Sequence, residues 1–319
     1  MKSKNYILSV LATGLMAGSL VSCSDFLDTK PSTSVDDTDV FQTTSGAQSA
    51  LNGCYYQMRA YGSGGANRGD DYGIPSIQMI SDMCGEDVMS NGGGWYSFVY
   101  NYWGETQANI FRTDQLWTFH YRLINNLNSV ITYVDDSEGE DIDKQYIKGQ
   151  ALALRGWAYF DLARLYQQTY AIAKDMPGVP IYTEATSANT VGQPRGTVEN
   201  VFERINNDYQ TAVDLFEAAG IAQANPTNVD LYVTYGLWAR AAQVQEDWVA
   251  AAKYANAALE KPGLTRVASM TDLGQFNNCK APSIMWGFQV IADQTGPYGA
   301  FLSHMDPEGG CLLYTSPSP

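Results

Sequence analysis

Residues 142–166 have the sequence IDKQYIKGQALALRGWAYFDLARLY, and this stretch decides the fold. Its apolar residues recur every three or four positions, which is the period of one buried helix face. That face consists of Ile147, Ala151, Leu154, Ala158, Leu162 and Leu165. Arg155, Asp161 and Arg164 fall on the other side, where a solvated or ion-paired surface is the ordinary expectation. We predict one amphipathic helix over the whole stretch.

The same period continues in the neighbouring segments. It predicts further helices over 46–58, 113–134, 198–216, 229–245 and 248–259, with Thr197 as an N-cap. In the last pair, small residues stand where the helices approach, Trp248 opens the second helix and Pro262 ends it, which is the order of a tetratricopeptide hairpin. Such hairpins bury their apolar faces only by stacking on neighbours. The sequence therefore predicts a predominantly α fold of tetratricopeptide-like helical hairpins with long loop insertions.

Three segments interrupt this pattern. Pro177, Gly178 and Pro180 predict an extended segment followed by a polar loop, and the glycine-rich stretch 62–104 predicts a long aromatic loop. Residues 283–291 alternate apolar with other residues, which predicts a strand with Trp286 buried on its inner side. We take that strand as the start of a second, loop-rich part with short strands.

The N-terminus has the pattern of an exported lipoprotein. Lys2 and Lys4 precede an apolar stretch that ends in Leu20-Val21-Ser22-Cys23, a lipobox, so we expect Cys23 to carry a fatty-acid (palmitate) anchor after cleavage. An ordinary signal peptide with a chance cysteine is the alternative. We expect a signal peptide over 1–22, a polar tether over 23–44, a helical scaffold over 45–275, the start of the second part over 276–310 and a non-native tail over 311–319.

Composition excludes several classes of function. The chain has 19 Lys and Arg against 34 Asp and Glu, a formal charge of −15, which repels nucleic acid. Cys54, Cys84, Cys279 and Cys311 match no zinc or redox spacing; export permits disulfides, but we favour buried free thiols. The chain has two histidines, His120 and His304, which are far apart in the sequence and have no metal-type partner beside them. The sequence therefore gives no sign of a zinc centre or a Ser-His-Asp triad, and we expect no metal and no cofactor.

Four motifs in order resemble the SusD/RagB family of outer-membrane glycan-binding lipoproteins. They are the lipobox with SDFLD (24–28) and Pro31, ALALRGWAYFDL (151–162), GVP (178–180), and VFERI (201–205) with Asp208. The resemblance runs from Cys23 to about Val290. Residues 312–319 continue no helix or strand pattern, so we expect the chain to be truncated near Gly310, and the greater length of family members supports this. The resemblance implies a tetratricopeptide-type scaffold without enzymatic activity, anchored by lipid to the outside of the outer membrane. There it would capture oligosaccharides as a lid over a TonB-dependent, SusC-like transporter.

Sugar-contacting residues have to be argued from chemistry. A sugar ring offers an apolar face and a rim of hydroxyls, so its site needs exposed aromatic planes beside groups that donate and accept hydrogen bonds. Loops on a rigid scaffold are where such sites usually lie. We expect Trp95 chiefly, with Tyr96, Tyr100, Trp103, Asn91, Asp82 and the loop residue Tyr298. Equally, these aromatic residues can pin a long loop onto the helices.

Three other readings of these residues remain open. A glycoside hydrolase would use two of Asp82, Glu86 and Asp87 as acid and base. The same acids with Asp70 and Asp71 offer calcium-type ligands, although no calcium-loop spacing is present. A helical-repeat adaptor that binds protein without any glycan affinity is the third.

Overall fold

The computed structural model describes residues 37–65, 71–85, 88–90, 97–101, 110–187, 189–267, 279–288 and 313–315. The chain divides into two units, residues 1–40 and residues 41–319. In the first unit the described part is the short helix α2 (Asp37–Val40). Every element below belongs to the second unit.

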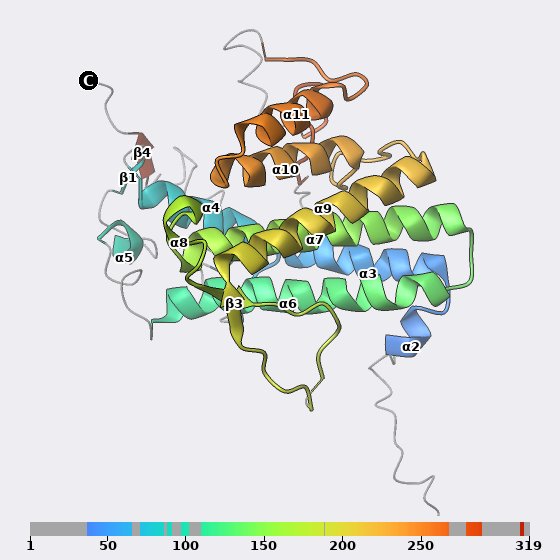
Figure 1. The fold of residues 1–319 in the computed structure, drawn as a ribbon, viewed down its shortest axis with the longest axis horizontal. Helices are drawn as coiled ribbons and strands as arrows, with labels where there is room; N and C mark the ends of the chain where they lie inside the picture. The colour runs from blue at the N-terminus through green and yellow to red at the C-terminus, as the bar shows by residue number, and fades with distance from the viewer. Residues whose placement is uncertain are drawn as a thin grey trace, which may run out of the picture. The chain divides into compact units, whose positions relative to one another are not determined.

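Helix α7 (Asp141–Tyr166) is the centre of the fold, and every residue in it from Gly149 to Ala163 is buried. It lies against α6 (Phe111–Tyr133), α9 (Val198–Ala219) and α3 (Thr44–Gln57) (Figure 1). The predicted helix is therefore confirmed, and of the residues expected on its solvated or ion-paired side, Arg155 and Asp161 are buried and Arg164 is exposed. Neighbours surround α7, which is typical of a helix that is apolar on most of its circumference.

Two glycines allow α9 to approach α7 closely. A Cβ atom added at Gly156 would lie 3.0 Å from Cε1 of Tyr209, and one added at Gly149 would lie 3.1 Å from Cε1 of Phe216. The rings of α9 thus rest directly on the backbone of α7. Glycine within a helix costs roughly 0.5–1 kcal/mol relative to alanine, and here the close ring contacts offset that cost.

Helices α10 (Leu231–Val244) and α11 (Trp248–Leu259) form an antiparallel hairpin that packs on α9 (Figure 1). Asp230 caps α10 by accepting a 2.8 Å hydrogen bond from Val233 N, and Asp247 caps α11 in the same way from Ala250 N. The tetratricopeptide-like hairpin predicted at this place is confirmed. Trp248, which opens its second helix, is 63% exposed.

The remaining elements are short. They are α4 (Ile74–Met83), α5 (Ser97–Tyr100), the 3-10 helix η3 (Val134–Asp136), α8 (Tyr170–Ala173), β1 (Val88–Ser90), β2 (Pro177–Pro180), β3 (Arg195–Thr197) and β4 (Leu313–Thr315). Strand β2 pairs antiparallel with β3 and forms the extended segment predicted at the prolines, whereas β3 was not foreseen. Strand β1 pairs antiparallel with β4, so the described part of the expected non-native tail takes strand form.

Helix α4 corrects the prediction that 62–104 is one long loop. Pro75 in its first turn and the spacing of Ile74, Ile77 and Ile80 are helix signals that the surrounding glycines masked. Gly73 precedes it with φ +63°, and a Cβ atom there would lie 2.4 Å from the Met58 carbonyl oxygen, so this turn needs glycine.

The predicted strand over 283–291 is wrong in its described part. Residues 279–288 form turns and bends, because their hydrogen bonds are made within the segment, to the loop before α10 and, from Thr265 N to the Pro282 carbonyl, to the segment after α11, rather than to a neighbouring strand. Trp286 is half-buried instead of buried, and its Nε1 donates a 3.1 Å hydrogen bond to the Thr227 carbonyl.

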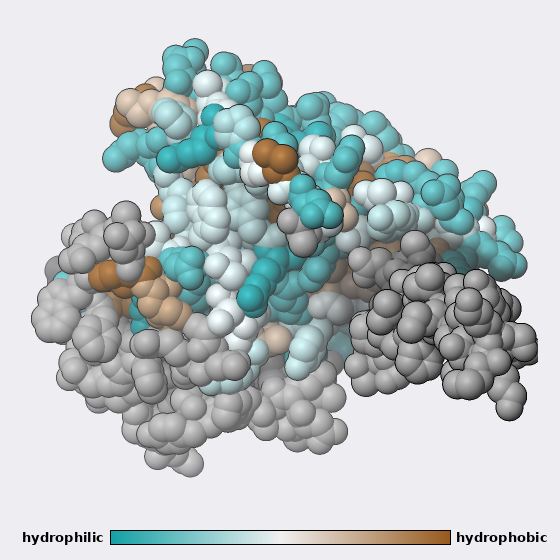
Figure 2. Space-filling view, turned by 90° about the horizontal axis from the view of Figure 1, so that it is seen from below, coloured by the Kyte–Doolittle hydropathy of each residue, from teal (hydrophilic) through white to brown (hydrophobic). Residues whose placement is uncertain are grey.

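The described residues also show the state of two thiols and the character of the surface. Cys54 and Cys279 are free thiols, and burial raises the pKa of the Cys54 thiol to about 12. Among the described residues, no helix has both the length and the apolar character required to cross a bilayer. On the face seen in Figure 2, hydrophilic and intermediate residues dominate the coloured surface and hydrophobic residues are scattered.

Candidate functional site

Most of the predicted sugar-contacting residues lie outside the described residues. These are Asn91, Trp95, Tyr96, Trp103 and Tyr298, together with the lipidation residue Cys23 and the acids Asp70, Glu86 and Asp87. Tyr100 is half-buried at the end of α5, and Asp82 is exposed on α4. Asp71 is fully buried and accepts a 2.8 Å hydrogen bond from Gly64 N, so it serves a turn. The predicted sugar contacts therefore stay predictions.

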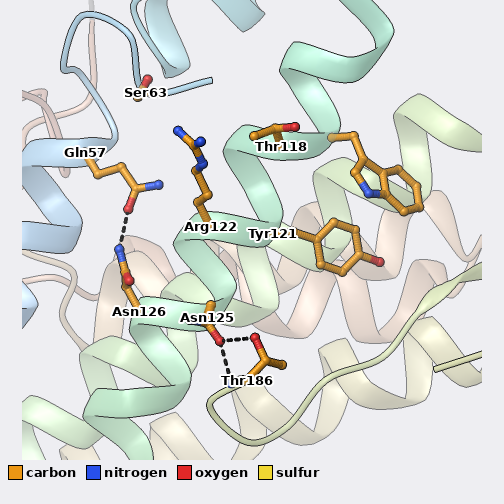
Figure 3. Close-up of a pocket in the computed structure, with 9 residues that line it drawn as sticks. Gln57, Ser63, Thr118, Tyr121, Arg122, Asn125, Asn126 and Thr186 are labelled. Carbon is orange, nitrogen blue, oxygen red and sulfur yellow. Dashed lines mark hydrogen bonds between the residues drawn. The ribbon is translucent and has the colours of Figure 1, made fainter. Parts of the chain in front are cut away.

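An open cleft of about 580 Å³ lies along the outer face of α6 (Figure 3). Its lining residues come from α6, from the end of α3 with the loop after it, and from the loop between β2 and β3. They are Gln57, Ser63, Trp117, Thr118, Tyr121, Arg122, Asn125, Asn126 and Thr186. We call this the α6 cleft.

Two aromatic rings form one wall of the α6 cleft. The ring centroids of Trp117 and Tyr121 are 4.7 Å apart, and Tyr166 meets the indole edge-on at 4.9 Å. The Tyr121 hydroxyl donates a 2.7 Å hydrogen bond to the Pro180 carbonyl, and burial raises its pKa, so it remains a neutral hydroxyl. Both rings are half-buried, which leaves them fixed in position with part of their surface open to the cleft.

The opposite wall is polar. Figure 3 shows the Arg122 side chain extending toward Ser63, with Gln57 beside it. Asn126 Nδ2 donates a 2.8 Å hydrogen bond to Gln57 Oε1, which orients both amides. The buried Ser63 hydroxyl has no hydrogen-bond partner among the described residues. A Cβ atom at Gly65, whose φ is +94°, would lie 3.2 Å from the Arg122 guanidinium, so the loop passes close to this cation.

The loop after β2 is tied to α6 by two asparagines, Asn125 and Asn128. Asn125 Oδ1 accepts hydrogen bonds from Thr186 N at 2.7 Å and from its hydroxyl at 2.8 Å (Figure 3). The buried Asn128 amide donates to the carbonyls of Tyr182 and Glu184 at 3.1 and 2.9 Å. These bonds satisfy carbonyls that a loop would otherwise leave to water, and they fix Thr186 in the cleft wall.

A buried ion pair supports this loop from below. Arg155 makes a two-point contact with Asp208, with nitrogen–oxygen distances of 2.8 and 2.7 Å, and Arg204 lies 3.0 Å from the same carboxylate. Arg155 Nη1 also donates to Asn128 Oδ1 at 2.8 Å and to the Thr183 carbonyl at 3.1 Å. Of the two alternatives expected for Arg155, a solvated or an ion-paired side chain, the structure shows the ion pair, and this pair is buried. The Arg155 guanidinium connects the core of the bundle to the cleft loop.

Asp161 forms a second buried polar group on α7. Its Oδ1 accepts a 2.7 Å hydrogen bond from Arg164, and His120 Nε2 lies 3.7 Å from its Oδ2. Burial alone would raise the pKa of Asp161, but His120 and Arg164 outweigh it and the pKa is lowered. His120 Nδ1 is 2.6 Å from the Leu116 carbonyl, so this histidine has a structural place in the core.

The chemistry of the α6 cleft is that of a binding site. Its described lining supplies aromatic surface, carboxamides, hydroxyls and one cation, and it contains no carboxylate, histidine or cysteine. The described residues also contain no group of three His, Cys, Asp or Glu side chains that could hold a metal ion. Such a lining can bind a neutral, hydroxyl-rich ligand. The described lining holds no pair of side chains that could act as general acid and general base.

Sequence reasoning missed this cleft, although a signal was present. Leu116, Phe119 and Leu123 form the buried stripe of α6, and Trp117 and Tyr121 lie off that stripe. Two aromatic residues one turn apart on the polar side of a helix indicate a surface that something else covers or binds.

Comparison with known proteins places the chain in a family. The model of the SusD-like family described as "Starch-binding associating with outer membrane" matches residues 25–234. The SusD-like protein P38 of Formosa agariphila is 27% identical over 218 residues, which cover 66% of this chain and 37% of that protein. This chain thus spans well under half of that relative's length.

Solved structures agree. A SusD-like carbohydrate binding protein from Bacteroides vulgatus is 27% identical, with a TM-score of 0.71 over 82% of this chain and 53% of that one. A SusD superfamily protein from Bacteroides fragilis is 19% identical, also with a TM-score of 0.71, over 88% of this chain and 63% of that one, and it shows the shared fold. Since the family model covers well over half of the chain and the helical scaffold agrees with it, this chain belongs to the SusD-like family.

Proposed function

We propose that this chain binds oligosaccharide in the α6 cleft and holds it at the cell surface for import through an outer-membrane transporter. The observation that carries the proposal is the pairing of the fixed Trp117 and Tyr121 rings with a wall of amides and hydroxyls across an open cleft. The family's description as starch-binding and the Bacteroides vulgatus relative's description as carbohydrate binding support it.

The cleft fits a sugar in chemistry and in size. An aromatic plane covers the C–H face of a sugar ring, and the amides of Gln57, Asn125 and Asn126 both donate and accept hydrogen bonds from hydroxyls. The guanidinium of Arg122 adds several donors without a competing acceptor. A volume of about 580 Å³ falls within the usual range for small-molecule sites.

The aromatic loop predicted from sequence belongs to the same proposal. Trp95, Tyr96, Tyr100 and Trp103, with Asn91, Asp82 and Tyr298, remain our candidates for additional sugar contacts. The substitution Trp95→Ala tests them separately from the α6 cleft, since these positions come from a different part of the chain.

We propose binding without cleavage. Glycoside hydrolysis needs two carboxyl groups placed on either side of the scissile bond, and no carboxylate lies among the described residues that line the cleft. Asp82, the described member of the predicted acid cluster, is exposed on α4 and is not among these residues. Incubation with polysaccharide followed by a reducing-end assay tests this, because new reducing ends would contradict the proposal.

We also propose that lipid on Cys23 anchors the chain to the outer membrane beside its transporter. The lipobox and the family description as associating with the outer membrane support this. Cys23→Ala should move the protein from the membrane pellet to the soluble fraction. Co-purification of a large TonB-dependent barrel with the wild-type protein tests the partner; a different partner without any glycan binding would favour the adaptor reading.

The decisive experiment is affinity electrophoresis in gels that contain soluble starch, alongside gels with a panel of other polysaccharides. Trp117→Ala should be retarded less than the wild type, with a Kd for the polysaccharide about 10-fold higher. Covering about 60 Å² of indole at about 25 cal/mol per Å² contributes roughly 1.5 kcal/mol, and 1.4 kcal/mol is a factor of ten.

Trp248→Ala is the matched control, because Trp248 is 63% exposed on α11 and belongs to no described cleft. It should migrate like the wild type in every gel. Equal retardation of Trp117→Ala and wild type would place the site elsewhere. A wild type that no polysaccharide retards would overturn the proposed function.

A further inference from the structure

A second cleft of about 570 Å³ lies on the other side of helix α3, outside the α6 cleft. It is formed by α3, by the N-terminal half of α7 and by the loop that precedes α10. Its lining residues are Gln48, Asn52, Tyr55, Tyr56, Arg59, Tyr146, Gln150, Ala224, Asn225, Thr227, Asn228 and Phe288. We call this the α3 cleft.

The α3 cleft repeats the chemistry of the α6 cleft. Its described lining combines three tyrosines with several carboxamides and one arginine, and it contains neither a carboxylate nor a lysine. At its floor, the buried Tyr55 hydroxyl donates a 2.9 Å hydrogen bond to Gln150 Oε1 and accepts a 2.8 Å bond from Val229 N. The floor is therefore fixed before any ligand arrives.

Tyr146 provides an unused donor in this cleft. Its hydroxyl oxygen is enclosed and has no hydrogen-bond partner among the described residues. Burial, reinforced by the charge of Asp230, raises its pKa to about 12, so the hydroxyl keeps its proton at neutral pH. An enclosed polar atom without a partner is costly, and a rotation of the ring that opens this oxygen to a ligand hydroxyl would remove that cost.

Tyr56 supplies the aromatic plane. Its side chain is 57% exposed, and the Arg59 guanidinium lies 5.3 Å from its ring centroid. The arginine restrains a ring that would otherwise rotate freely in solvent. A large ring that is mostly exposed yet held in place is the surface on which a sugar ring stacks.

The geometry of α3 connects the two clefts. With 3.6 residues per turn, Asn52 and Tyr56 lie on the flank toward the α3 cleft, and Gln57 lies on the flank toward the α6 cleft. Gly53 falls on the exposed ridge between them, one turn before Gln57. A Cβ atom at Gly53 would meet nothing within 4 Å, so neither packing nor backbone conformation requires glycine there. At this residue no side chain stands between the two clefts.

We propose that one oligosaccharide chain crosses α3 at Gly53 and occupies both clefts, with Tyr56 as the second stacking platform. This inference rests on the proposed function and adds that the protein selects ligands by length. A chain long enough to reach both clefts binds the second one intramolecularly, which raises its affinity above that of a short chain. A helix with its side chains is about 10–12 Å across, a span that several sugar units cover.

The test is isothermal titration calorimetry with maltotriose as the short ligand and maltoheptaose as the long one, chosen because the family is described as starch-binding. The wild type should bind maltoheptaose about 10-fold or more tightly than maltotriose. Tyr56→Ala should remove most of this preference by weakening maltoheptaose binding more than maltotriose binding, whereas Tyr56→Phe, which keeps the ring, should retain the preference.

Gly53→Leu places a branched, non-aromatic side chain on the ridge, and Gly53→Ala is its matched control. The leucine variant should lose the preference for the long ligand and the alanine variant should keep it. If Tyr56→Ala and Gly53→Leu both keep the wild-type preference while Trp117→Ala weakens both ligands, the second subsite is refuted and the proposed function stands. If the wild type binds neither ligand, the two-cleft proposal is overturned for starch-type chains, and the polysaccharide panel decides separately whether the proposed function stands.

Discussion

Replacing Arg155 by methionine tests whether the buried ion pair supports both the core and the cleft loop. The Arg155 and Asp208 side chains are 4% and 0% exposed, so the charges have little access to water. Methionine fills similar space without a charge and leaves Asp208 buried with Arg204 as its remaining cation, 3.0 Å away. The Thr183 carbonyl also loses its 3.1 Å bond.

The expected loss follows from this geometry. Removing one partner of a buried ion pair costs roughly 3–5 kcal/mol, because the other charge stays uncompensated. Arg204 compensates Asp208 in part, so we expect a loss of about 3 kcal/mol in the free energy of unfolding. At about 2–4 °C per kcal/mol for a domain of this size, the melting temperature should fall by about 6–12 °C.

The assay is urea unfolding followed by circular dichroism, with Lys148→Met as the matched control. Lys148 pairs with Asp135 at the surface, where the two side chains are 23% and 58% exposed, and such pairs contribute at most about 1 kcal/mol. If Arg155→Met loses no more stability than Lys148→Met, the claim that the buried Arg155–Asp208 pair contributes more to stability than a surface pair is refuted.

Three further outcomes can be measured with the same unfolding assay or with a thiol reagent. Gly156→Val should lower the free energy of unfolding by about 2 kcal/mol or more, because its Cβ atom would lie 3.0 Å from the Tyr209 ring. Gly53→Ala, at a position with open space, should raise the free energy of unfolding by about 0.5–1 kcal/mol. The opposite order of stability would contradict the close contact between α7 and α9. The pKa of the Asp161 carboxyl is lower in the folded protein than in the unfolded chain, so its charge stabilises the fold at pH values above the unfolded pKa, and this contribution is lost as the pH falls through the folded pKa. Between about pH 5 and pH 2, the wild type should therefore lose stability more steeply than Asp161→Asn. Parallel curves for the two proteins would refute this role of Asp161. Burial raises the pKa of the Cys54 thiol to about 12, so this thiol should react with a thiol reagent only when the protein unfolds. Rapid labelling of Cys54 in the native protein would contradict its burial.

Local pattern predicted the helices well where periodicity and caps agreed. The helix predicted to start after Thr197 begins at Val198, with Thr197 and Asn200 forming a capping box, and α11 begins at the predicted Trp248. Helix α4 was missed because glycines on both sides suggested a loop. The strand predicted at 283–291 failed because alternation indicates a strand only when a neighbouring strand accepts its hydrogen bonds, and none does so for the described residues 283–288.

The sequence by itself determined the helical period, the caps, the hairpin order and the family resemblance, because each depends on residues near one another in the chain. Tertiary structure decided which polar residues are buried and which aromatic residues share a surface. Arg155 and Asp208 are 53 positions apart, and the α6 cleft joins α3, α6 and the loop after β2. Such pairings arise from the stacking of helices around α7, and a local pattern records only which side of a helix is apolar, not which partner will cover it.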